Sequence, residues 1–239
     1  PWSVALAVLL AGVALTRELP PWREPARTLS FDAVQGRDWA PAAELRAELV
    51  VWPEGAYKGE LARLPKPAAD TLLTAHDKGK NVAVLLQPDG SISIAEKEVL
   101  VPFGEYMPRF LSFLRHVSPR TDTLAPGAPS KPLQLPTGGF AGTLICYENL
   151  SPGRARRLVA QGADFLVTQA SSSWTPDRRA AEMHARFSAL RAIETRRAVL
   201  HVADRGPTVL FAPDGRELDR LEHGRSGRLH GAIPLPERR

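Results

Sequence analysis

Seven residues at positions 142–148, GTLICYE, decide how the chain is interpreted, because they close an apolar run and carry the only cysteine of the sequence. Residues 140–147 favour a β-strand, and Ser151 followed by Pro152 is typical of a helix start. This pattern predicts a strand, a short turn and a helix. Near a helix N-terminus, partial positive charge favours the Cys146 thiolate, whereas many free cysteines are inert core residues. The local sequence leaves both interpretations of Cys146 open.

The composition bounds the class of protein. The chain has 239 residues, of which 44% are hydrophobic, and this is enough for one large α/β domain. A net charge of +5 suits a nucleic-acid surface, an anionic membrane surface or simply a basic proteome, and it does not choose between them. One cysteine excludes an internal disulfide, and the six histidines show no metal-ligand spacing. We therefore predict no metal site.

The N-terminal segment is apolar. Residues 2–15 read WSVALAVLLAGVAL, without a charge, and Arg17 and two prolines follow. A full membrane helix needs about 20 such residues. We therefore predict that residues 1–19 are the end of a transmembrane or interfacial helix and that residues 20–27 are a linker, with a buried soluble helix as the alternative.

From residue 28 onward, short apolar stretches alternate with helical patches, which predicts one α/β domain over residues 28–239. Strands are predicted at residues 28–33, 48–52, 81–87, 91–95, 140–147, 165–169, 199–203, 208–212 and 228–234. Helices are predicted at residues 42–47, 68–78, 151–161 and 177–195.

The last of these helices carries two stripes. We assign one stripe to the core and the other to a solvated face, as is usual for a run of charge. The apolar stripe contains Met183, Phe187, Leu190 and Ile193, with Glu194 beside it. The basic stripe contains Arg178, Arg179, Arg186, Arg191, Arg196 and Arg197.

Two charged residues lie just past the ends of predicted strands, and Cys146 lies at the end of another. Glu54 comes after the strand at 48–52, and Lys97 comes after the strand at 91–95. The carboxyl ends of strands gather ligand sites in α/β proteins, so these side chains are placed to meet Cys146. Each alone is more often a surface residue. Together they supply a nucleophile, a base to take the thiol proton and a cation to hold an oxyanion.

Three motifs resemble the nitrilase superfamily of carbon–nitrogen hydrolases. They are WPEG at 52–55, Lys97 followed by LVPFGEY at 100–106, and ICYE at 145–148. The second and third resemble those of the apolipoprotein N-acyltransferase branch. The resemblance implies a nitrilase-like α/β fold, an α-β-β-α sandwich.

The resemblance also implies a role for each matching residue. Glu54 corresponds to the general base, Lys97 to the oxyanion-stabilising lysine and Cys146 to the nucleophile. The supporting residues of the family correspond to Glu105, Tyr147 and Glu148. Trp39 and Trp174 match the substrate-binding tryptophans more loosely.

The activity implied by the resemblance is transfer of a fatty acyl chain from a phospholipid, through a thioester on Cys146, to the N-terminal amine of a lipoprotein. Such an enzyme works in the bacterial inner membrane with its catalytic domain facing the periplasm. The implied partners are the phospholipid donor, the lipoprotein acceptor and the membrane. No cofactor and no nucleic acid are predicted, and the oligomeric state stays open. Most of the membrane portion of the family is absent, so we expect a fragment or a reduced relative.

The chain departs from the family pattern at two places. Where the family has Asn-Asp-x-Trp-Phe, it reads ASSSW at 170–174, and where the family has Asn-x-Gly, Asp204 begins the triplet that ends at Gly206. Two other functions therefore stay open. One is a soluble nitrilase-type amidase with the same three residues, and the other is a catalytically silent relative that binds lipid or lipoprotein.

Overall fold

The computed structural model describes residues 25, 27–36, 47–108, 110–111, 113, 124–172 and 177–237. The predicted apolar segment 1–19, Trp39, Trp174 and all but one residue of the predicted helix at 42–47 lie outside these residues. Among the helices that the structure describes, none has the length and apolar composition needed to cross a membrane.

Two six-stranded sheets form the centre of the molecule. In the first sheet β1 and β2 are parallel, as are β2 and β3, and the other neighbours are antiparallel. The strand order of this sheet is β12 (Gly227–Leu235), β1 (Arg27–Gln35), β2 (Leu49–Val51), β3 (Asp70–Asp77), β4 (Lys80–Leu86) and β5 (Ile92–Glu96).

The second sheet repeats this plan. Its three parallel strands are β7, β8 and β9, and antiparallel strands flank them. The strand order is β11 (Glu217–Leu221), β10 (Thr208–Phe211), β9 (Val199–Ala203), β8 (Phe165–Ala170), β7 (Phe140–Ile145) and β6 (Leu133–Gln134). The strands predicted from the sequence are present, and only β3, β6 and β11 had no strand prediction.

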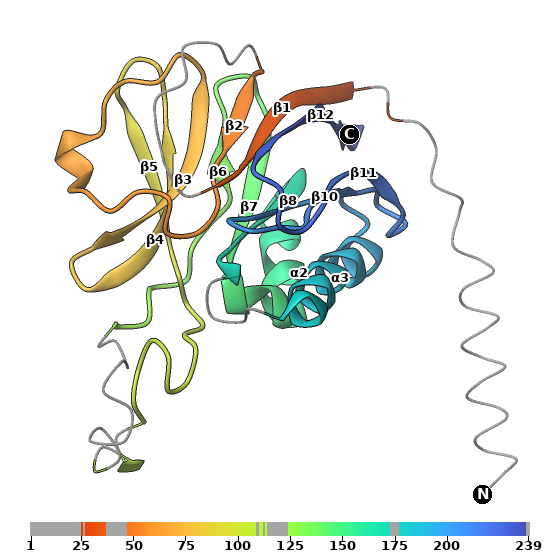
Figure 1. Ribbon diagram of the computed structural model, residues 1–239. Helices are drawn as coiled ribbons and strands as arrows, with labels where there is room; N and C mark the ends of the chain where they lie inside the picture. The colour runs from red at the N-terminus through yellow and green to blue at the C-terminus, as the bar shows by residue number, and fades with distance from the viewer. Residues whose placement is uncertain are drawn as a thin grey trace, which may run out of the picture.

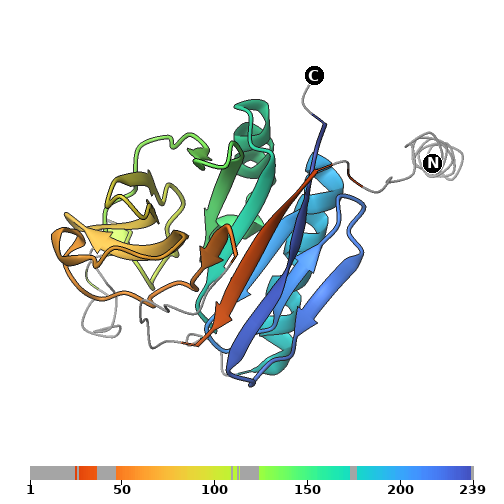
Figure 2. The ribbon, with the colours of Figure 1, turned by 90° about the horizontal axis from the view of Figure 1, so that it is seen from above.

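The two sheets face one another across one apolar core, as the view in Figure 2 shows. Phe31 and Leu85 of the first sheet belong to the same buried cluster as Phe165 and Leu200 of the second. Their burial removes apolar surface from water, at about 25 cal/mol per Å². A pair of sheets that packs in this way is the two-layer centre expected from the sequence.

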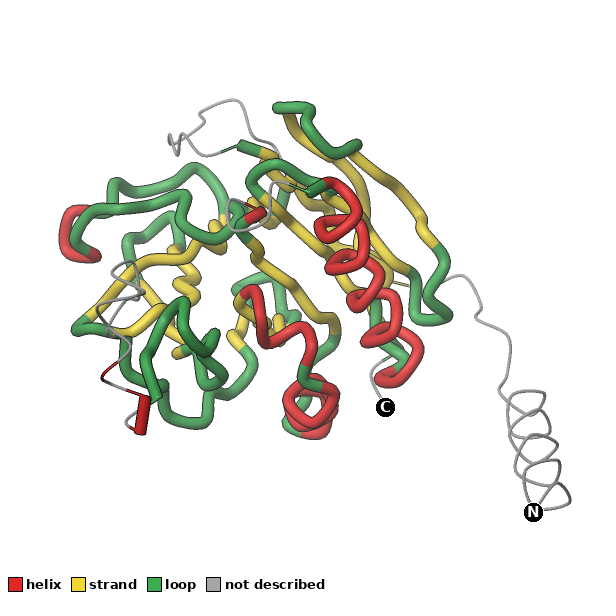
Figure 3. The backbone as a smooth tube through the Cα atoms, turned by 60° about the horizontal axis from the view of Figure 1, so that its bottom comes forward, coloured by secondary structure: helices red, strands yellow, loops and turns green. Residues whose placement is uncertain are grey.

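Helices α2 (Pro152–Ala160) and α3 (Arg178–Thr195) cover the outer face of the second sheet (Figures 1 and 3). Gly142 on β7 allows the close approach of α2, because a Cβ there would lie 3.2 Å from Leu158 Cβ of that helix, and 2.6 Å from Leu166 Cδ2 on the neighbouring strand. The side chain of Asp177 caps the start of α3 by accepting the Arg179 N–H. Arg196 ends the helix in the left-handed conformation, with φ of 54°.

The outer face of the first sheet is covered differently. Trp52 and Val84 pack there against residues of the segment 56–69, which includes the short 3₁₀ helix η1 (Leu61–Arg63). Within the described residues, no α-helix lies on this face. The nitrilase-like α/β arrangement with two sheets is thus confirmed, while the second helical layer of the predicted sandwich is not found in that part of the chain.

The prediction of a helix at residues 68–78 is wrong, because this segment forms strand β3. The first six residues of β3 are all buried, between β2 on one side and β4 on the other. A short, fully buried apolar segment has no one-sided pattern, so periodicity does not distinguish a strand from a helix. Pairing with both neighbours decides the conformation.

The structure also corrects the prediction of which α3 residues are buried. Met183, Leu190 and Ile193 are exposed, whereas Arg191 is only 4% exposed. Apart from Arg191, the buried face of the helix is made of small residues, which let the helix approach the sheet: Ala181, Ala185, Ser188, Ala192 and Thr195. Arg191 therefore belongs to the interior and not to the solvated face.

The burial of Asp70 at the start of β3 can be tested through the pH dependence of the free energy of unfolding. Burial, and then the negative charge of Asp89, raise the pKa of Asp70 to about 6. Because an unfolded aspartate has a pKa of about 3.9, the wild-type protein loses stability as the pH rises from about 4 to about 6. We expect Asp70→Asn to raise the free energy of unfolding by about 1 kcal/mol at pH 7.5, after allowance for solvent screening, and to have little effect at pH 4. Urea unfolding at the two pH values measures this, and an equal gain at both would contradict it.

Candidate active site

The site lies where strands of both sheets end. Cys146 follows β7 and Ser171 follows β8, and because these strands are parallel their carboxyl ends meet at one edge. Glu54 follows β2 of the other sheet, and its backbone N–H donates to the carbonyl of Ala170 at 3.3 Å. This hydrogen bond joins the two sheets at the site.

Lys97 is the centre of a buried ion cluster. Its Nζ lies 2.7 Å from Glu105 Oε1 and 3.4 Å from Glu54 Oε1. Asn81 Nδ2 donates to Glu54 Oε1 at 2.8 Å and lies 3.4 Å from Glu105 Oε1. Glu105 Oε2 in turn accepts the N–H of Val101 at 2.8 Å. The ammonium is fully buried between two carboxylates that are themselves held in place.

The electrostatics of this cluster favour a charged lysine. Burial lowers the pKa of Lys97, but the negative charge of Glu54, together with the charge and the hydrogen bond of Glu105, outweighs burial, so the pKa lies above its ordinary value. A lysine that keeps its proton is suited to stabilise an oxyanion. It cannot serve as a base near neutral pH.

Cys146 is a thiol at rest. Burial and the neighbouring charge of Glu54 raise the pKa of the thiol, against the smaller opposing effects of Lys97 and the backbone N–H of Ser171. The expected helix N-terminus does not overcome burial, because the turn after β7 is a short 3₁₀ helix, η3 (Cys146–Leu150). The sulfur therefore needs a base. Glu54 Oε2, which makes no hydrogen bond within the described part of the chain, is an available proton acceptor.

The three side chains open into one cavity of about 250 Å³. Glu105 and Tyr147 also line it, so five residues predicted for the site are brought together. The remaining lining is largely apolar, and it comes from Val101, Leu150, Ala180 and Ala181, with Ser171, Ser172 and His184. A cavity with one polar end and apolar walls is suited to a substrate with a reactive carbonyl on an apolar chain.

Glu148 lies behind the cavity and is fully buried. Its Oε1 accepts the N–H groups of Glu98 and Val99, at 2.7 and 3.2 Å, and its Oε2 accepts the N–H of Ile145 at 2.9 Å. Arg154 Nε lies 3.0 Å from Oε1. Burial raises the pKa of Glu148, opposed by Arg154 and by these N–H groups. One carboxylate therefore ties the segment after Lys97 to the residue before Cys146.

Glu98 continues this connection. It accepts the N–H of Ser130 at 2.8 Å and forms ion pairs with Arg154 and Arg157 of α2. The residue next to Lys97 is thus attached to the helix that follows Cys146. This role is not predictable from the sequence, because Glu98, Arg154 and Arg157 match no motif.

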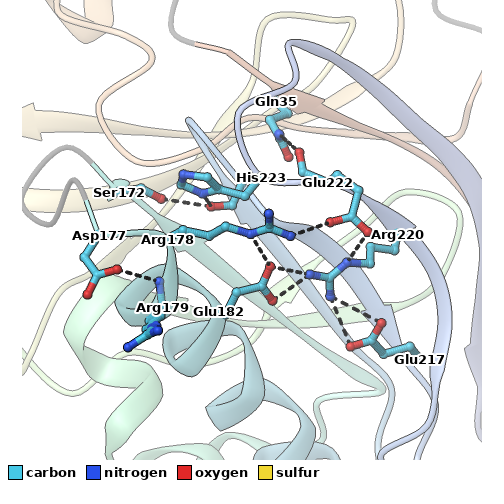
Figure 4. Close-up of polar contacts among 11 residues, drawn as sticks. Gln35, Ser172, Asp177, Arg178, Arg179, Glu182, Glu217, Arg220, Glu222 and His223 are labelled. Atoms are coloured by element: carbon cyan, nitrogen blue, oxygen red, sulfur yellow. Dashed lines mark hydrogen bonds and ion pairs between the residues drawn. The ribbon is translucent and has the colours of Figure 1, made fainter.

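The two departures from the family pattern contact each other. Asp204 Oδ1 accepts the N–H of Ser172 at 2.6 Å, and Oδ2 accepts the hydroxyl of Ser171 at 3.3 Å. Ser172 Oγ donates to the carbonyl of Gly206 at 3.3 Å, and the ring of His223 lies 2.9 Å from the same oxygen. The side chains of Ser172 and His223 are shown in Figure 4. The wall beside Cys146 is therefore one hydrogen-bonded unit.

An ion-pair network supports this wall from outside. Arg220 of β11 lies between the carboxylates of Glu182, Glu217 and Glu222 (Figure 4). Arg178 reaches Glu182 and Glu222 at 3.9 and 3.8 Å. The network connects the start of α3 to β11 and to the loop that carries His223.

Helix α3 also holds the turn of Cys146, which the sequence did not predict. His184 Nε2 lies 3.0 Å from the carbonyl oxygen of Cys146. Arg191 Nη1 donates to the carbonyl of Asn149 at 3.2 Å. The only sequence signal was the spacing of His184 and Arg191 along the alanine-rich face of the helix.

Residues 60–239 match the carbon–nitrogen hydrolase family. The chain belongs to this family. The predicted resemblance to apolipoprotein N-acyltransferases is also confirmed, since three curated relatives carry that name. The relative from Parasynechococcus marenigrum is 33% identical over 92% of this chain and 52% of its own length. Those from Synechocystis and Azotobacter vinelandii are 32% and 30% identical over 82% and 98% of this chain, and 35% and 51% of their own lengths. The chain spans about half the length of these relatives or less.

Solved structures share the fold. Saccharomyces cerevisiae Nit3, a member of branch 10 of the nitrilase superfamily, superposes with a TM-score of 0.62 at 14% identity, over 90% of this chain and 93% of its own. A glutamate-to-glutamine mutant of an amidase from Nesterenkonia, with the acetamide moiety of fluoroacetamide covalently added at its active-site cysteine, superposes with a TM-score of 0.61 at 16% identity, over 89% and 92% of the two chains. These similarities establish the two-sheet arrangement.

The buried connection through Glu148 gives a test of the site. Glu148→Gln keeps the shape but removes the charge that pairs with Arg154, and it sets an amide group against backbone N–H donors. We expect a loss of about 3 kcal/mol in the free energy of unfolding, since one partner of a buried ion pair is left alone. The control is Glu217→Gln, whose pair with Arg220 is half exposed. We expect that substitution to cost less than about 1 kcal/mol in urea unfolding. Similar losses in both variants would disprove the structural role of Glu148.

Proposed function

We propose that the chain is the catalytic part of an N-acyltransferase that moves a fatty acyl chain from a phospholipid to the N-terminal amine of a lipoprotein. The observation that carries the proposal is the convergence of Glu54, Lys97 and Cys146 on one largely apolar cavity. The name of the relatives supplies the donor and acceptor classes. Residues 28–239 are the catalytic domain in this proposal.

In the first half of the reaction, Cys146 Sγ attacks the ester carbonyl of the phospholipid while Glu54 takes the thiol proton. The carbonyl oxygen becomes an oxyanion next to the Lys97 ammonium. One such donor is worth about 3 kcal/mol of transition-state stabilisation in a site that excludes water. The tetrahedral intermediate then expels the lysophospholipid oxygen, which takes the proton from Glu54, and a thioester on Cys146 remains.

In the second half, the lipoprotein amine attacks the thioester carbonyl. Glu54 takes a proton from the amine, and the tetrahedral intermediate expels the sulfur of Cys146. The proton on Glu54 returns to that sulfur, so the products are an amide and the original thiol. The raised pKa of Cys146 suits this cycle, because the thiol is the resting form and Glu54 is its base in one half and its acid in the other.

We place this reaction at the bacterial inner membrane with the catalytic domain facing the periplasm. The support is the resemblance of the three motifs and the name of the relatives. The apolar lining of the cavity suits an acyl chain. Tyr147 and Leu150, which line the cavity, are 37% and 39% exposed, so the apolar surface continues to the mouth of the cavity.

The test is the mass of the intact protein after incubation with phospholipid vesicles. We expect a gain of one fatty acyl chain that hydroxylamine removes and that Cys146→Ala abolishes. Since the sequence has one cysteine, the site of a thioester is unambiguous. Glu54→Gln should slow acylation by about 10²- to 10⁴-fold, because it removes the base and keeps the shape of the side chain.

The same samples separate the other two functions. Hydrolysis of short amides with no acyl adduct from vesicles would favour a soluble amidase. Absence of both activities, with lipid binding retained, would favour a silent relative. The matched control is His76→Asn, which replaces an exposed residue of β3. This variant should be acylated at the wild-type rate.

A further inference from the structure

Helix α3 and the nucleophile turn η3 hold each other through reciprocal contacts. The ring of His184 contacts the carbonyl of Cys146 through Nε2, at 3.0 Å. Asn149 Nδ2 of η3 donates back to the carbonyl of His184 at 2.9 Å. Since both contacts join the same two elements, the ring of His184 has a defined place relative to Cys146.

The chemistry of the contact sets the tautomer. A carbonyl oxygen only accepts hydrogen bonds, so Nε2 of His184 carries the proton. Burial lowers the pKa of His184, which keeps the ring neutral near pH 7. The ring packs edge-to-face against that of His201, with centroids 5.2 Å apart and an angle of 81° between the planes. His201 is held in turn by Ser188, whose Oγ lies 3.0 Å from Nδ1. The ring therefore has little freedom to turn.

Cys146 requires such a support because its backbone is strained. Its φ is +49°, in the left-handed region that residues with a side chain rarely adopt. A peptide unit is planar, so holding the Cys146 carbonyl also fixes the plane that follows the Cα atom. The direction of the Cα–Cβ bond, and with it the position of Sγ between Glu54 and Lys97, depends on that plane.

We propose that His184 is a positioning residue, which holds Cys146 in its left-handed conformation and so keeps the thiol directed into the cavity. The neutral ring donates one hydrogen bond to the Cys146 carbonyl and takes no proton from the substrate or the thiol. The inference rests on the proposed nucleophilic role of Cys146, and it adds a residue outside the three motifs to the site.

Two substitutions separate positioning from packing. The Nε2 atom of glutamine is as many bonds from Cα as the Nε2 atom of histidine. His184→Gln therefore retains a donor for the carbonyl of Cys146. His184→Asn has a shorter side chain whose donor does not reach. The readout is the rate at which iodoacetamide alkylates Cys146, followed by intact mass. We expect His184→Asn to slow alkylation about tenfold or more, in line with a displaced nucleophile, and His184→Gln to stay within about threefold of wild type. Equal rates for the two variants, or a wild-type rate for His184→Asn, would overturn the proposal.

Alkylation does not depend on the acyl donor, so this test is independent of the proposed function. If wild-type protein is alkylated but never acylated by vesicles, the acyltransferase proposal fails while the role of His184 is still decided by the variants. His76→Asn, exposed on β3, should alkylate at the wild-type rate. Thermal unfolding of each variant shows whether it is folded.

A measurement on the wild-type protein covers the case in which His184→Asn does not fold. The ¹⁵N chemical shifts of the histidine rings should show His184 neutral at pH 7 with its proton on Nε2, and the assignment follows from the loss of this signal in His184→Gln. A neutral ring with its proton on Nδ1 and none on Nε2 would overturn the proposal, because the carbonyl of Cys146 would then lack this donor.

Discussion

The buried ammonium of Lys97 is the constraint on which the site depends. Taking a charge out of water costs several kcal/mol, and only well-placed opposite charges offset that cost. Glu54 and Glu105 lie on opposite sides of Lys97 in the chain, at the end of β2 and in the loop after β5. Ion pairing therefore requires these segments to meet. Where they meet, a carboxylate with one oxygen that makes no hydrogen bond to the described residues lies next to the only thiol.

Two further sets of contacts hold the Cys146 thiol next to the Lys97 ion cluster. From one side Glu148 ties the backbone after Lys97 to the backbone before Cys146. From the other side α3 contacts the carbonyls of Cys146 and Asn149. The strained conformation of Cys146 is held between them, in the way that functional sites keep a costly backbone conformation through surrounding contacts.

The two departures from the family pattern, which are separate in the sequence, are adjacent in the structure. In the sequence, the serines at 171–172 and Asp204 are separate losses of expected residues. In the structure they are hydrogen-bonded to each other beside Cys146. The carboxylate on one strand end is matched by a hydroxyl and an N–H on the neighbouring one.

The sequence by itself determined the α/β class, most of the strands, helices α2 and α3, and the catalytic candidates, because apolar alternation, turn residues and short motifs are local properties. It did not determine β3, the buried face of α3, or the roles of Asn81, Glu98, Arg191 and His184. Those depend on partners distant in the chain: β3 is a strand because β2 and β4 pair with it, and Arg191 is buried because a carbonyl of η3 accepts its hydrogen bond. Cys146 illustrates both the local and the tertiary contributions. Its position at a strand end is visible in GTLICYE. The protonation of its thiol follows from burial and from Glu54, which only the folded chain brings beside it.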